Sequence, residues 1–213
     1  MSAPSISVLL PVFNAAPLLG DSVESVLDQT FGDFELLIVN DGSTDETAAI
    51  LREIRDPRVR VLTNSSNRGL TRSLNRGLAE ARGEFIARQD ADDLCEPHRF
   101  ERQIAFLRNL PQIPLLGTAG WRVNSSTRKT GSNDLPTTHE AILWASVTDN
   151  PFLHTSVMFR RAVIANEFGG YNEEFPICQD FELWSRIAAR YQVANLVHRL
   201  VRMREHASSM TQT

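Results

Sequence analysis

The chain contains little cysteine. Its 213 residues include two cysteines, Cys95 and Cys178, and their separation does not match the spacing of a metal-binding motif. Cysteines in a reducing compartment normally remain thiols, because disulfides are rare there. We therefore expect two free thiols in a reduced, cytoplasmic protein.

The chain also lacks an excess of basic residues. Lysine and arginine together number 22, against 26 aspartate and glutamate residues, which gives a net charge of −4. Proteins that bind nucleic acid through its phosphates usually carry a basic patch and a basic overall balance. We therefore expect no nucleic-acid partner.

No long apolar run is present. The apolar stretch at residues 6–12 is too short for a membrane span, and no basic segment precedes it as one would in a signal peptide. We therefore expect the chain to stay in the cytoplasm. A peripheral contact at the inner face of the membrane is compatible with this pattern.

Two glycine motifs that bind phosphates are missing. No Gly-x-Gly-x-x-Gly follows the first apolar run, and no glycine-rich loop ends in Gly-Lys-Ser or Gly-Lys-Thr. These absences exclude a Rossmann dinucleotide site and a P-loop. They also argue against a nucleotidyltransferase that makes sugar nucleotides, which would need a glycine-rich loop near the first strand. A phosphate bound here must be held by metal and side chains.

Apolar runs and helical repeats alternate through the first half of the chain. Runs of strand length occur at residues 6–13, 34–39, 58–62 and 84–87, and segments with helical spacing separate them at about 17–31, 47–55 and 70–81. This βαβαβαβ order predicts a parallel sheet covered by helices. The fold class is therefore α/β, with a mostly parallel central sheet flanked by helices.

The pattern changes after residue 95. We expect helices at 97–110, 138–146 and 180–191, strands at 115–119, 156–159 and 193–203, and a hairpin or mobile loop at 124–134. No internal repeat or linker divides the chain, and 42% hydrophobic residues suffice for one core. We therefore expect a single domain over residues 1–213, whose second half forms a lid and a substrate wall.

Three carboxylates, Asp90, Asp92 and Asp93, follow the fourth apolar run. Carboxylates this close repel one another unless a cation lies between them, and Mg²⁺ and Mn²⁺ favour carboxylate, water and phosphate oxygens. The cluster therefore indicates metal-dependent chemistry on a phosphorylated substrate. The alternative is a solvated acidic turn in front of the helix that starts near Pro97.

Polar segments follow each of the four predicted strands. The first strand ends in Asn14, the second in residues 40–45, the third near residues 64–67 and the fourth in the acidic cluster that starts at Asp90. Ligands of open parallel sheets bind outside the carboxyl ends of the strands. We therefore expect these four segments to meet at one rim and to form the site.

Five segments resemble, in their order along the chain, the family 2 inverting glycosyltransferases of the GT-A (Rossmann-like) fold. They are Ser7-Val8-Leu9-Leu10-Pro11-Val12-Phe13-Asn14, Asn40-Asp41-Gly42-Ser43-Thr44-Asp45, Asn67-x-Gly69-Leu70, Asp90-Ala91-Asp92-Asp93 and Gln179-Asp180-x-x-Leu183-Trp184. The resemblance runs from about Ile6 to His206. It implies transfer of a sugar from a nucleoside diphosphate sugar to an acceptor hydroxyl, with inversion at the anomeric carbon and with Mg²⁺ or Mn²⁺.

The resemblance also implies a division of labour and a setting. A nucleotide-binding half would span about residues 1–95, and a C-terminal acceptor-side half about 96–213. The acceptor would be a saccharide or a lipid-linked acceptor, in the synthesis of a bacterial cell-surface polysaccharide or lipopolysaccharide.

The resemblance places the nucleotide on the first two strands. Pro11, Phe13 and Asn14 match the family's first nucleotide-pocket segment, and Asp41 matches the carboxylate that reads the base. A carboxylate accepts a hydrogen bond from the ring N–H of uracil or thymine, which favours UDP or dTDP, although guanine also offers N–H donors and GDP fits as well. The alternative is that Asp41 opens a turn with Gly42.

Further residues match positions around the diphosphate. Asp90 and Asp92 match the family's Asp-x-Asp motif, in which the first reaches the ribose and the last holds the metal. His206 matches a late Arg-x-His segment that supplies a metal ligand from a tail. Arg72 could face the nucleotide, and an exposed helix arginine is its alternative. Asp93 would brace the loop or cap the next helix.

Asp180 matches the family's catalytic base, which removes the acceptor's proton. Gln179 stands where the family often has a second acidic residue. The alternative for Asp180 is an N-cap of the helix that follows. The neutral Gln179 and the short tail also suggest another function, a catalytically silent nucleotide-sugar-binding module.

Three residues are assigned to the acceptor side by the resemblance. They are His154, Gln179 and Trp184. A packed histidine is the alternative for His154, and a core position is the alternative for Trp184.

Overall fold

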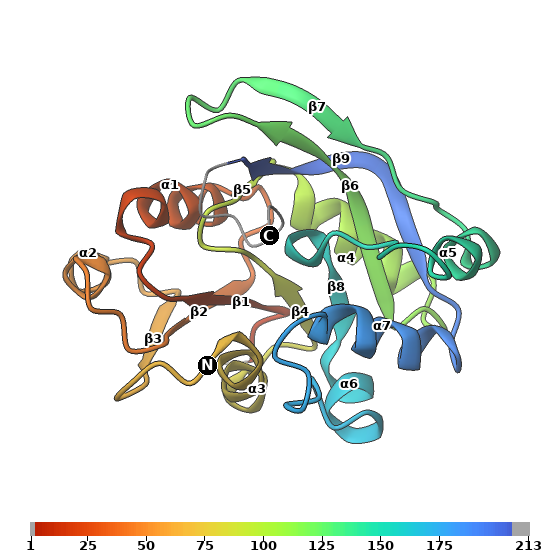
Figure 1. Ribbon diagram of the computed structural model, residues 1–213, viewed down its shortest axis with the longest axis horizontal. Helices are drawn as coiled ribbons and strands as arrows, with labels where there is room; N and C mark the ends of the chain where they lie inside the picture. The colour runs from red at the N-terminus through yellow and green to blue at the C-terminus, as the bar shows by residue number, and fades with distance from the viewer. Residues whose placement is uncertain (1–2, 206–213) are drawn as a thin grey trace.

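The computed structural model describes residues 3–205, which fold around one nine-stranded sheet (Figure 1). The strand order is β3-β2-β1-β4-β8-β6-β9-β5, and β7 pairs with β6. The first half supplies β1 (Ile6–Val12), β2 (Phe34–Asn40), β3 (Val59–Thr63) and β4 (Phe85–Arg88). These four strands are parallel, as the sequence predicts.

Three helices connect the parallel strands. They are α1 (Ala16–Leu27), α2 (Thr47–Glu53) and α3 (Leu70–Glu80). α3 lies very close to β1, because a Cβ atom on Gly77 would lie 2.0 Å from a methyl carbon of Leu9. Glycine at this position lets the helix settle on the sheet, and the carboxyl ends of the strands face the loops that carry the polar segments.

The second half extends the sheet in mixed directions. It comprises β5 (Leu94–Cys95), α4 (Arg99–Asn109), β6 (Leu115–Val123), β7 (Lys129–Asn133), α5 (His139–Ala145), a 3₁₀ turn (His154–Ser156), β8 (Met158–Arg160), α6 (Arg161–Glu167), α7 (Gln179–Ala188) and β9 (Ala194–Arg204). β8 is antiparallel to both β4 and β6, whereas β9 is parallel to β6. The predicted parallel order therefore holds for the first half, and the whole sheet is mixed.

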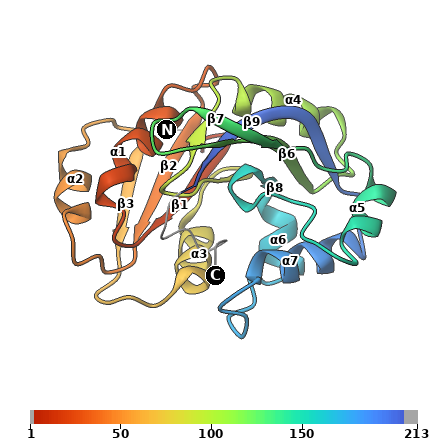
Figure 2. The same ribbon diagram turned by 45° about the horizontal axis from the view of Figure 1, so that its top comes forward.

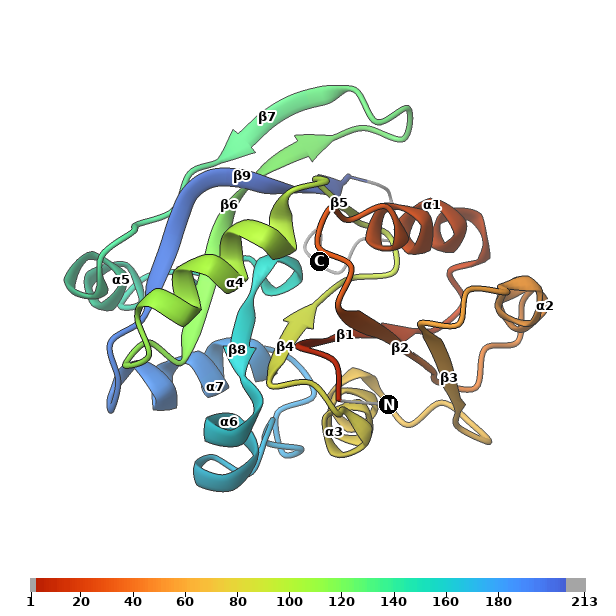
Figure 3. The same cartoon turned by 180° about the vertical axis from the view of Figure 1, so that it is seen from behind.

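Helices cover both faces of the sheet (Figures 1 and 3). One core contains the apolar side of α1 together with Phe100, Ile104 and Leu107 of α4. The other core contains Leu74 of α3, Ile164 of α6 and side chains of α7. Figure 2 shows the strands β6, β7 and β9 arching over the molecule beyond the parallel part.

Three elements of the second half do not appear in the sequence-based expectations. They are β5, the 3₁₀ turn at 154–156 and α6. The polar stretch at 124–134 is a hairpin, because β7 pairs antiparallel with the end of β6. Within residues 3–205, no helix is both long enough and apolar enough to cross a bilayer.

Candidate active site

The loops after β1 and β2 are joined by hydrogen bonds at the rim of the sheet. Asn14 has a left-handed backbone with φ of 50°. Its side-chain oxygen accepts from the Thr44 backbone N–H at 2.8 Å, and its own backbone N–H donates to Ser43 Oγ at 3.0 Å. The adjacent Phe13 is 44% exposed, whereas Pro11 is buried in β1. Of the predicted nucleotide segment, Phe13 therefore offers an open ring face at the rim.

Asp41 is buried at the end of β2 and already has hydrogen-bond donors from the protein. Its Oδ1 accepts from Asn64 Nδ2 at 2.6 Å and from the Arg68 backbone N–H at 2.9 Å. Its Oδ2 accepts from the Gly69 backbone N–H at 2.9 Å. With 3% exposure, Asp41 braces the loop that leads into α3. This bracing is the local role observed, and reading of a base stays a prediction.

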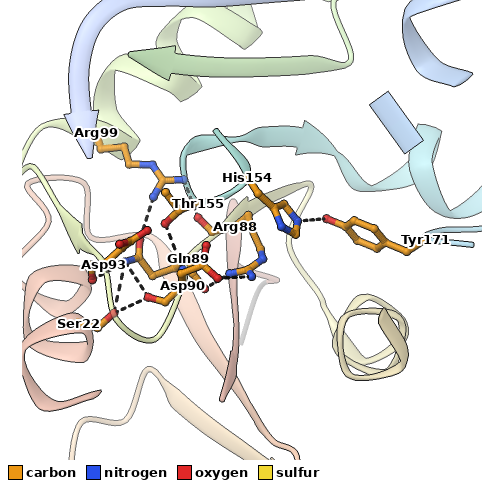
Figure 4. A network of polar contacts seen from close by, with 9 residues as sticks. All are labelled: Ser22, Arg88, Gln89, Asp90, Asp93, Arg99, His154, Thr155 and Tyr171. Carbon is orange, nitrogen blue, oxygen red and sulfur yellow. Dashed lines mark hydrogen bonds and ion pairs between the residues drawn. The ribbon is translucent and has the colours of Figure 1, made fainter. Parts of the chain in front are cut away.

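The acidic cluster lies at the end of β4 (Figure 4). Asp90 Oδ1 accepts from Arg88 Nη2 at 2.6 Å, and the Asp90 backbone N–H donates to Thr155 Oγ1 at 3.2 Å. Asp93 Oδ1 accepts from the backbone N–H of Arg204 at 3.0 Å. The last strand of the sheet therefore holds the cluster from one side and the 3₁₀ turn holds it from the other.

Burial and like charge act on the cluster together. Burial raises the pKa of the Asp90 carboxyl, the nearby Arg88 guanidinium opposes that rise, and the charges of Asp92 and Asp180 add to it. Burial, followed by the charges of Asp90 and Asp92, raises the pKa of the Asp93 carboxyl well above its usual range. The cluster therefore concentrates negative charge that a cation would relieve.

The donor chemistry of the cluster fits Mg²⁺ or Mn²⁺. Asp90, Asp92 and Asp93 offer only oxygen atoms, which both ions prefer. Among residues 3–205, no group of three or more His, Cys, Asp or Glu side chains is arranged so that it could hold a metal ion by itself. A site completed by substrate phosphates needs only one or two protein carboxylates. The predicted ligand His206 lies outside the described residues.

A buried polar network adjoins the cluster (Figure 4). Gln89 donates from Nε2 to the Asp93 backbone oxygen at 2.8 Å and to Ser22 Oγ at 3.3 Å. Its Oε1 accepts from Arg99 Nη1 at 3.0 Å. Arg99 is fully buried and also donates to the Arg88 backbone oxygen at 2.7 Å. Buried groups that are paired in this way fix the strand end rigidly.

Both cysteines are free thiols, as expected. Cys95 is buried beside this network, where its Sγ lies 3.2 Å from an Arg99 nitrogen. Cys178 is exposed and has a left-handed backbone directly in front of α7.

Asp180 is the second residue of α7 and not its N-cap, which corrects the alternative prediction. The helix begins at Gln179, and Cys178 occupies the N-cap. Asp180 Oδ2 accepts from Asn150 Nδ2 at 2.8 Å. Asp90 is bonded to Thr155 and Asp180 to Asn150, so the end of β4 and the start of α7 border the same segment. Gln179 is only 6% exposed.

Two of the predicted acceptor-side residues are packed. Trp184 is 1% exposed and its ring lies 6.1 Å from that of His154, so it presents no open ring face to an acceptor sugar. His154 Nε2 lies 3.1 Å from the Tyr171 hydroxyl. Burial and then the Arg88 charge lower the pKa of the His154 imidazole well below its usual range. His154 is therefore neutral near pH 7 and packs in the wall of the site.

Arg72 does not point into this cluster. Its Nε lies 3.3 Å from Glu173 Oε2, and both side chains are about half exposed. The pair connects α3 with the loop in front of α7. These contacts match the alternative given for Arg72, an exposed arginine on the surface of a helix.

Sequence reasoning missed Arg88, Asn150 and Thr155, which contact the predicted residues directly. Arg88 carried a signal, because a charged residue inside an apolar strand is rarely buried without a partner. Asn150 precedes Pro151 in an irregular segment, and nothing local shows that it reaches Asp180. The sequence also gives no sign that Thr155 contacts Asp90.

The chain matches a family model and curated relatives over much of its length. The model described as glycosyl transferase family 2 matches residues 7–166. EpsE of Bacillus subtilis is 33% identical over 214 residues, which cover 98% of this chain and 76% of EpsE. The Escherichia coli UDP-Glc:alpha-D-GlcNAc-diphosphoundecaprenol beta-1,3-glucosyltransferase WfgD is 36% identical over 102 residues, which cover 48% of this chain and 40% of WfgD.

Solved structures share the fold. S. aureus TarS 1–349 in complex with UDP-GlcNAc has a TM-score of 0.82 at 20% identity, with 100% of this chain and 61% of that chain covered. The mannosyltransferase PcManGT from Pyrobaculum calidifontis, solved with GDP-Man and Mn²⁺, has a TM-score of 0.71 at 19% identity, with 99% and 59% covered. The chain thus spans about three fifths of either solved chain.

The family match extends from β1 to α6 and includes the loops that carry Asn14, Asp41 and the acidic cluster. The structural matches extend the likeness across α7 and β9. The chain therefore belongs to glycosyl transferase family 2, and the predictions of a GT-A fold and of a transferase enzyme are confirmed.

Proposed function

We propose that this chain transfers a sugar from a nucleoside diphosphate sugar to an acceptor hydroxyl, with inversion at the anomeric carbon. The observation that supports it most is the meeting of Asp90 and Asp180. Asp90 follows β4, on the predicted donor side, and Asp180 lies in the first turn of α7, yet both are hydrogen-bonded to the segment in front of β8, through Thr155 and Asn150. Inversion requires a base on the face opposite the leaving group, and a carboxylate across the site from the donor-side cluster suits that role.

The donor is a nucleoside diphosphate sugar held by the half at about residues 1–95. Phe13 and Asn14 line the rim for the base and ribose, with Pro11 shaping the strand behind them, and Asp90 takes a ribose hydroxyl. UDP is favoured because TarS was solved with UDP-GlcNAc, and GDP remains an option because PcManGT was solved with GDP-Man. Asp41 keeps its observed contacts to the loop, and a remaining lone pair of its carboxylate accepts a hydrogen bond from the base.

Catalysis depends on Mg²⁺ or Mn²⁺ in this proposal. Asp92 would hold the ion together with the donor phosphates, and His206 would add a nitrogen ligand. Such an ion would supply Lewis-acid stabilisation of the departing diphosphate. Arg88 pairs with the Asp90 carboxylate from the protein side, and Arg99 donates to the Arg88 backbone oxygen.

Asp180 takes the proton of the acceptor hydroxyl as the new bond to the anomeric carbon forms. Its carboxylate lies in the first turn of α7, where Asn150 Nδ2 donates to one of its oxygens at 2.8 Å. Gln179 is buried beside it and adds no competing charge. The deprotonated acceptor oxygen then attacks while the bond to the diphosphate breaks.

The acceptor side comprises about residues 96–213, with His154 and Trp184 as packed residues that shape its wall. WfgD acts on a diphosphoundecaprenol-linked acceptor, as its name states, which supports a saccharide or lipid-linked acceptor for this chain. A role in bacterial cell-surface polysaccharide synthesis follows from the same likeness. The chain would work in the cytoplasm at the inner face of the membrane.

The test begins with calorimetric titration of UDP, dTDP and GDP, each with Mn²⁺ and with EDTA. Release of nucleotide from the matching donor, UDP-GlcNAc or UDP-Glc for UDP, then measures turnover. We expect metal-dependent binding with slow donor hydrolysis. Asp180→Asn should bind nucleotide normally and lose turnover, whereas the matched carboxylate change Glu174→Gln at an exposed position should keep both. Normal turnover by Asp180→Asn would remove Asp180 from its role.

A catalytically silent nucleotide-sugar-binding module is the second candidate. It is favoured by Gln179, which is buried and neutral where relatives of this kind often carry a second acid. Metal-dependent binding with no release of nucleotide from any donor would establish this candidate over the first.

A further inference from the structure

We propose that Asn150 is the positioning residue for the Asp180 carboxylate. Its amide holds one carboxylate oxygen, so the other is kept for the acceptor's proton. This inference rests on the proposed role of Asp180 as the base and adds the residue that sets its orientation. Asn150 stands in the middle of the loop between α5 and the 3₁₀ turn, thirty positions before its partner.

The orientation of the Asn150 amide is fixed by its second hydrogen bond. Its Oδ1 accepts from the Phe152 backbone N–H at 3.2 Å. The Nδ2 group therefore faces Asp180 Oδ2, at 2.8 Å. A flipped amide would place Asn150 Oδ1 against the Asp180 carboxylate and Nδ2 against the Phe152 N–H. The first contact would join two acceptors and the second two donors, so these partners fix the orientation of the amide.

The segment that carries Asn150 is anchored to the last strand. Asn195 of β9 is 4% exposed and donates from Nδ2 to the Pro151 backbone oxygen at 2.9 Å and to the Pro136 backbone oxygen at 2.8 Å. Phe152 is 3% exposed, and its ring centroid lies 6.2 Å from that of Trp184 in α7. Backbone hydrogen bonds and aromatic packing thus hold Asn150 and α7 in one fixed relation.

Two glycines in β6 make room for this anchor. A Cβ atom on Gly117 would lie 2.0 Å from Asn195 Oδ1 and 2.7 Å from a ring carbon of Phe152. A Cβ atom on Gly120 would lie 2.7 Å from a methyl carbon of Leu153. Any side chain at either position would push the segment away from the sheet. The close approach of the backbone is therefore built into β6.

Asp180 has no other hydrogen bond to its carboxylate within residues 3–205. α7 also begins without a side-chain cap in this part of the chain, so its first turn does not hold the carboxylate. Within these residues, the bond from Asn150 is consequently the hydrogen bond that restrains the direction of the Asp180 carboxylate. A base misplaced by about 1 Å can lose on the order of 100-fold in rate.

The experiment measures turnover, binding and stability for a matched set of variants. Turnover is release of UDP from UDP-GlcNAc and from UDP-Glc with Mn²⁺, and binding is calorimetric titration of UDP. Asn150→Ala removes both side-chain bonds, and Asn150→Asp keeps an acceptor for the Phe152 N–H but loses the donor to Asp180. Asn166→Ala, at an exposed position of α6, is the matched control.

We expect turnover to fall about 10- to 100-fold in both Asn150 variants, with the Kd for UDP and the KM for the donor within about twofold of the wild-type values. Asn166→Ala should match the wild type. A merely structural role predicts a different result, because a disturbed fold would change binding and melting temperature together with turnover.

The double variant decides whether Asn150 acts through Asp180. If it does, adding Asn150→Ala to Asp180→Asn changes the residual rate by less than about twofold, since the group it positions is already gone. Additive losses would overturn the proposal. Wild-type turnover in Asn150→Ala and Asn150→Asp, together with an inactive Asp180→Asn, would also overturn the role of Asn150. The role of Asp180 as the base would then still stand. Wild-type turnover in Asp180→Asn, or none in the wild type, would instead refute the proposed function and this inference with it.

Discussion

Arg88 Nη2 lies 2.6 Å from Asp90 Oδ1, and the Arg88 side chain is fully buried while that of Asp90 keeps 30% exposure. The Arg88 Nε is also buried and has no hydrogen-bond partner among residues 3–205. A guanidinium taken this far out of water is held in place only by the groups it pairs with. The positive charge beneath the acidic cluster is therefore part of the fold as well as part of the site.

Replacing Arg88 with methionine should destabilise the chain by about 2–4 kcal/mol, because the Asp90 carboxylate loses its buried counter-charge. Arg88→Lys keeps the charge but not the planar fork, and it should recover part of the loss. Urea unfolding at pH 7 in EDTA measures the difference. Equal unfolding midpoints for Arg88→Met and the wild type would mean that the pair contributes nothing to stability.

Asp93 makes the stability of the chain depend on pH. Its folded pKa is raised by burial, followed by the charges of Asp90 and Asp92, so the folded chain keeps a proton that the unfolded chain loses near pH 3.8. Folding is therefore penalised progressively as pH rises from that value through the raised folded pKa.

Asp93→Asn should remove this penalty, since the amide oxygen can still accept from the Arg204 backbone N–H. We expect the variant to be more stable than the wild type by about 1–3 kcal/mol at pH 8 and equal to it near pH 3.8. Urea unfolding at several pH values in EDTA tests this. A gain that does not change with pH would point to packing and not to ionisation.

Asp92→Ala should remove the metal dependence of nucleotide binding. The wild type is expected to bind UDP at least about tenfold more tightly with Mn²⁺ than with EDTA, and the variant should show the same weak binding under both conditions. Calorimetry gives the four Kd values. Asp28→Asn, at an exposed position after α1, serves as the control and should retain the full difference. Retained metal dependence in Asp92→Ala would place the ion elsewhere.

Asp41→Ala should cost stability as well as nucleotide affinity. Its carboxylate accepts from Asn64 and from the backbone N–H groups of Arg68 and Gly69, and truncation removes all three hydrogen bonds, although Asn64 keeps its bond to Ser73 and Gly69 keeps its bond to Asn67. Each such loss in a partly buried loop costs about 1 kcal/mol, so we expect about 2–4 kcal/mol in total. Thermal unfolding and UDP titration measure the two effects. Unchanged stability with weaker binding would assign Asp41 to the base alone.

The first half of the fold could be predicted because its signals are local. Residues 6–12 and 34–40 are buried throughout, and the apolar spacing of the intervening helices is regular, so each element is visible in a short window. The convergence of the strand ends then follows from parallel topology, which has few alternatives. The structure places the strand ends within about one residue of the expectation.

The second half could be predicted only in part, because its contacts join distant segments. β5 has two residues, which is too few for any periodicity, and it forms only by pairing with β9. α6 starts directly after β8 with no loop between them to mark its beginning. The bond from Asn150 to Asp180 is equally invisible, since neither residue sits in a repeating pattern that includes the other.

Side-chain partners limited the prediction of the site itself. The sequence identified Asp41 and Trp184 as candidates, but only the structure shows that Asp41 faces Asn64 and the next loop, and that Trp184 faces His154 and Phe152. Residue type and order along the chain specify which groups are present. The direction of each side chain depends on packing across the whole sheet.

The pairing of β5 with β9 also sets an order of events during synthesis. Asp90 to Asp93 leave the ribosome early, together with the parallel strands, but Leu94 pairs with Arg202 and Asp93 accepts from the backbone of Arg204. A nascent chain can therefore assemble its α/β half long before the acidic turn acquires its final shape. The acidic turn can pair with β9 only after β9 has been translated. An incompletely synthesised chain would therefore lack the hydrogen bond from Arg204 to Asp93.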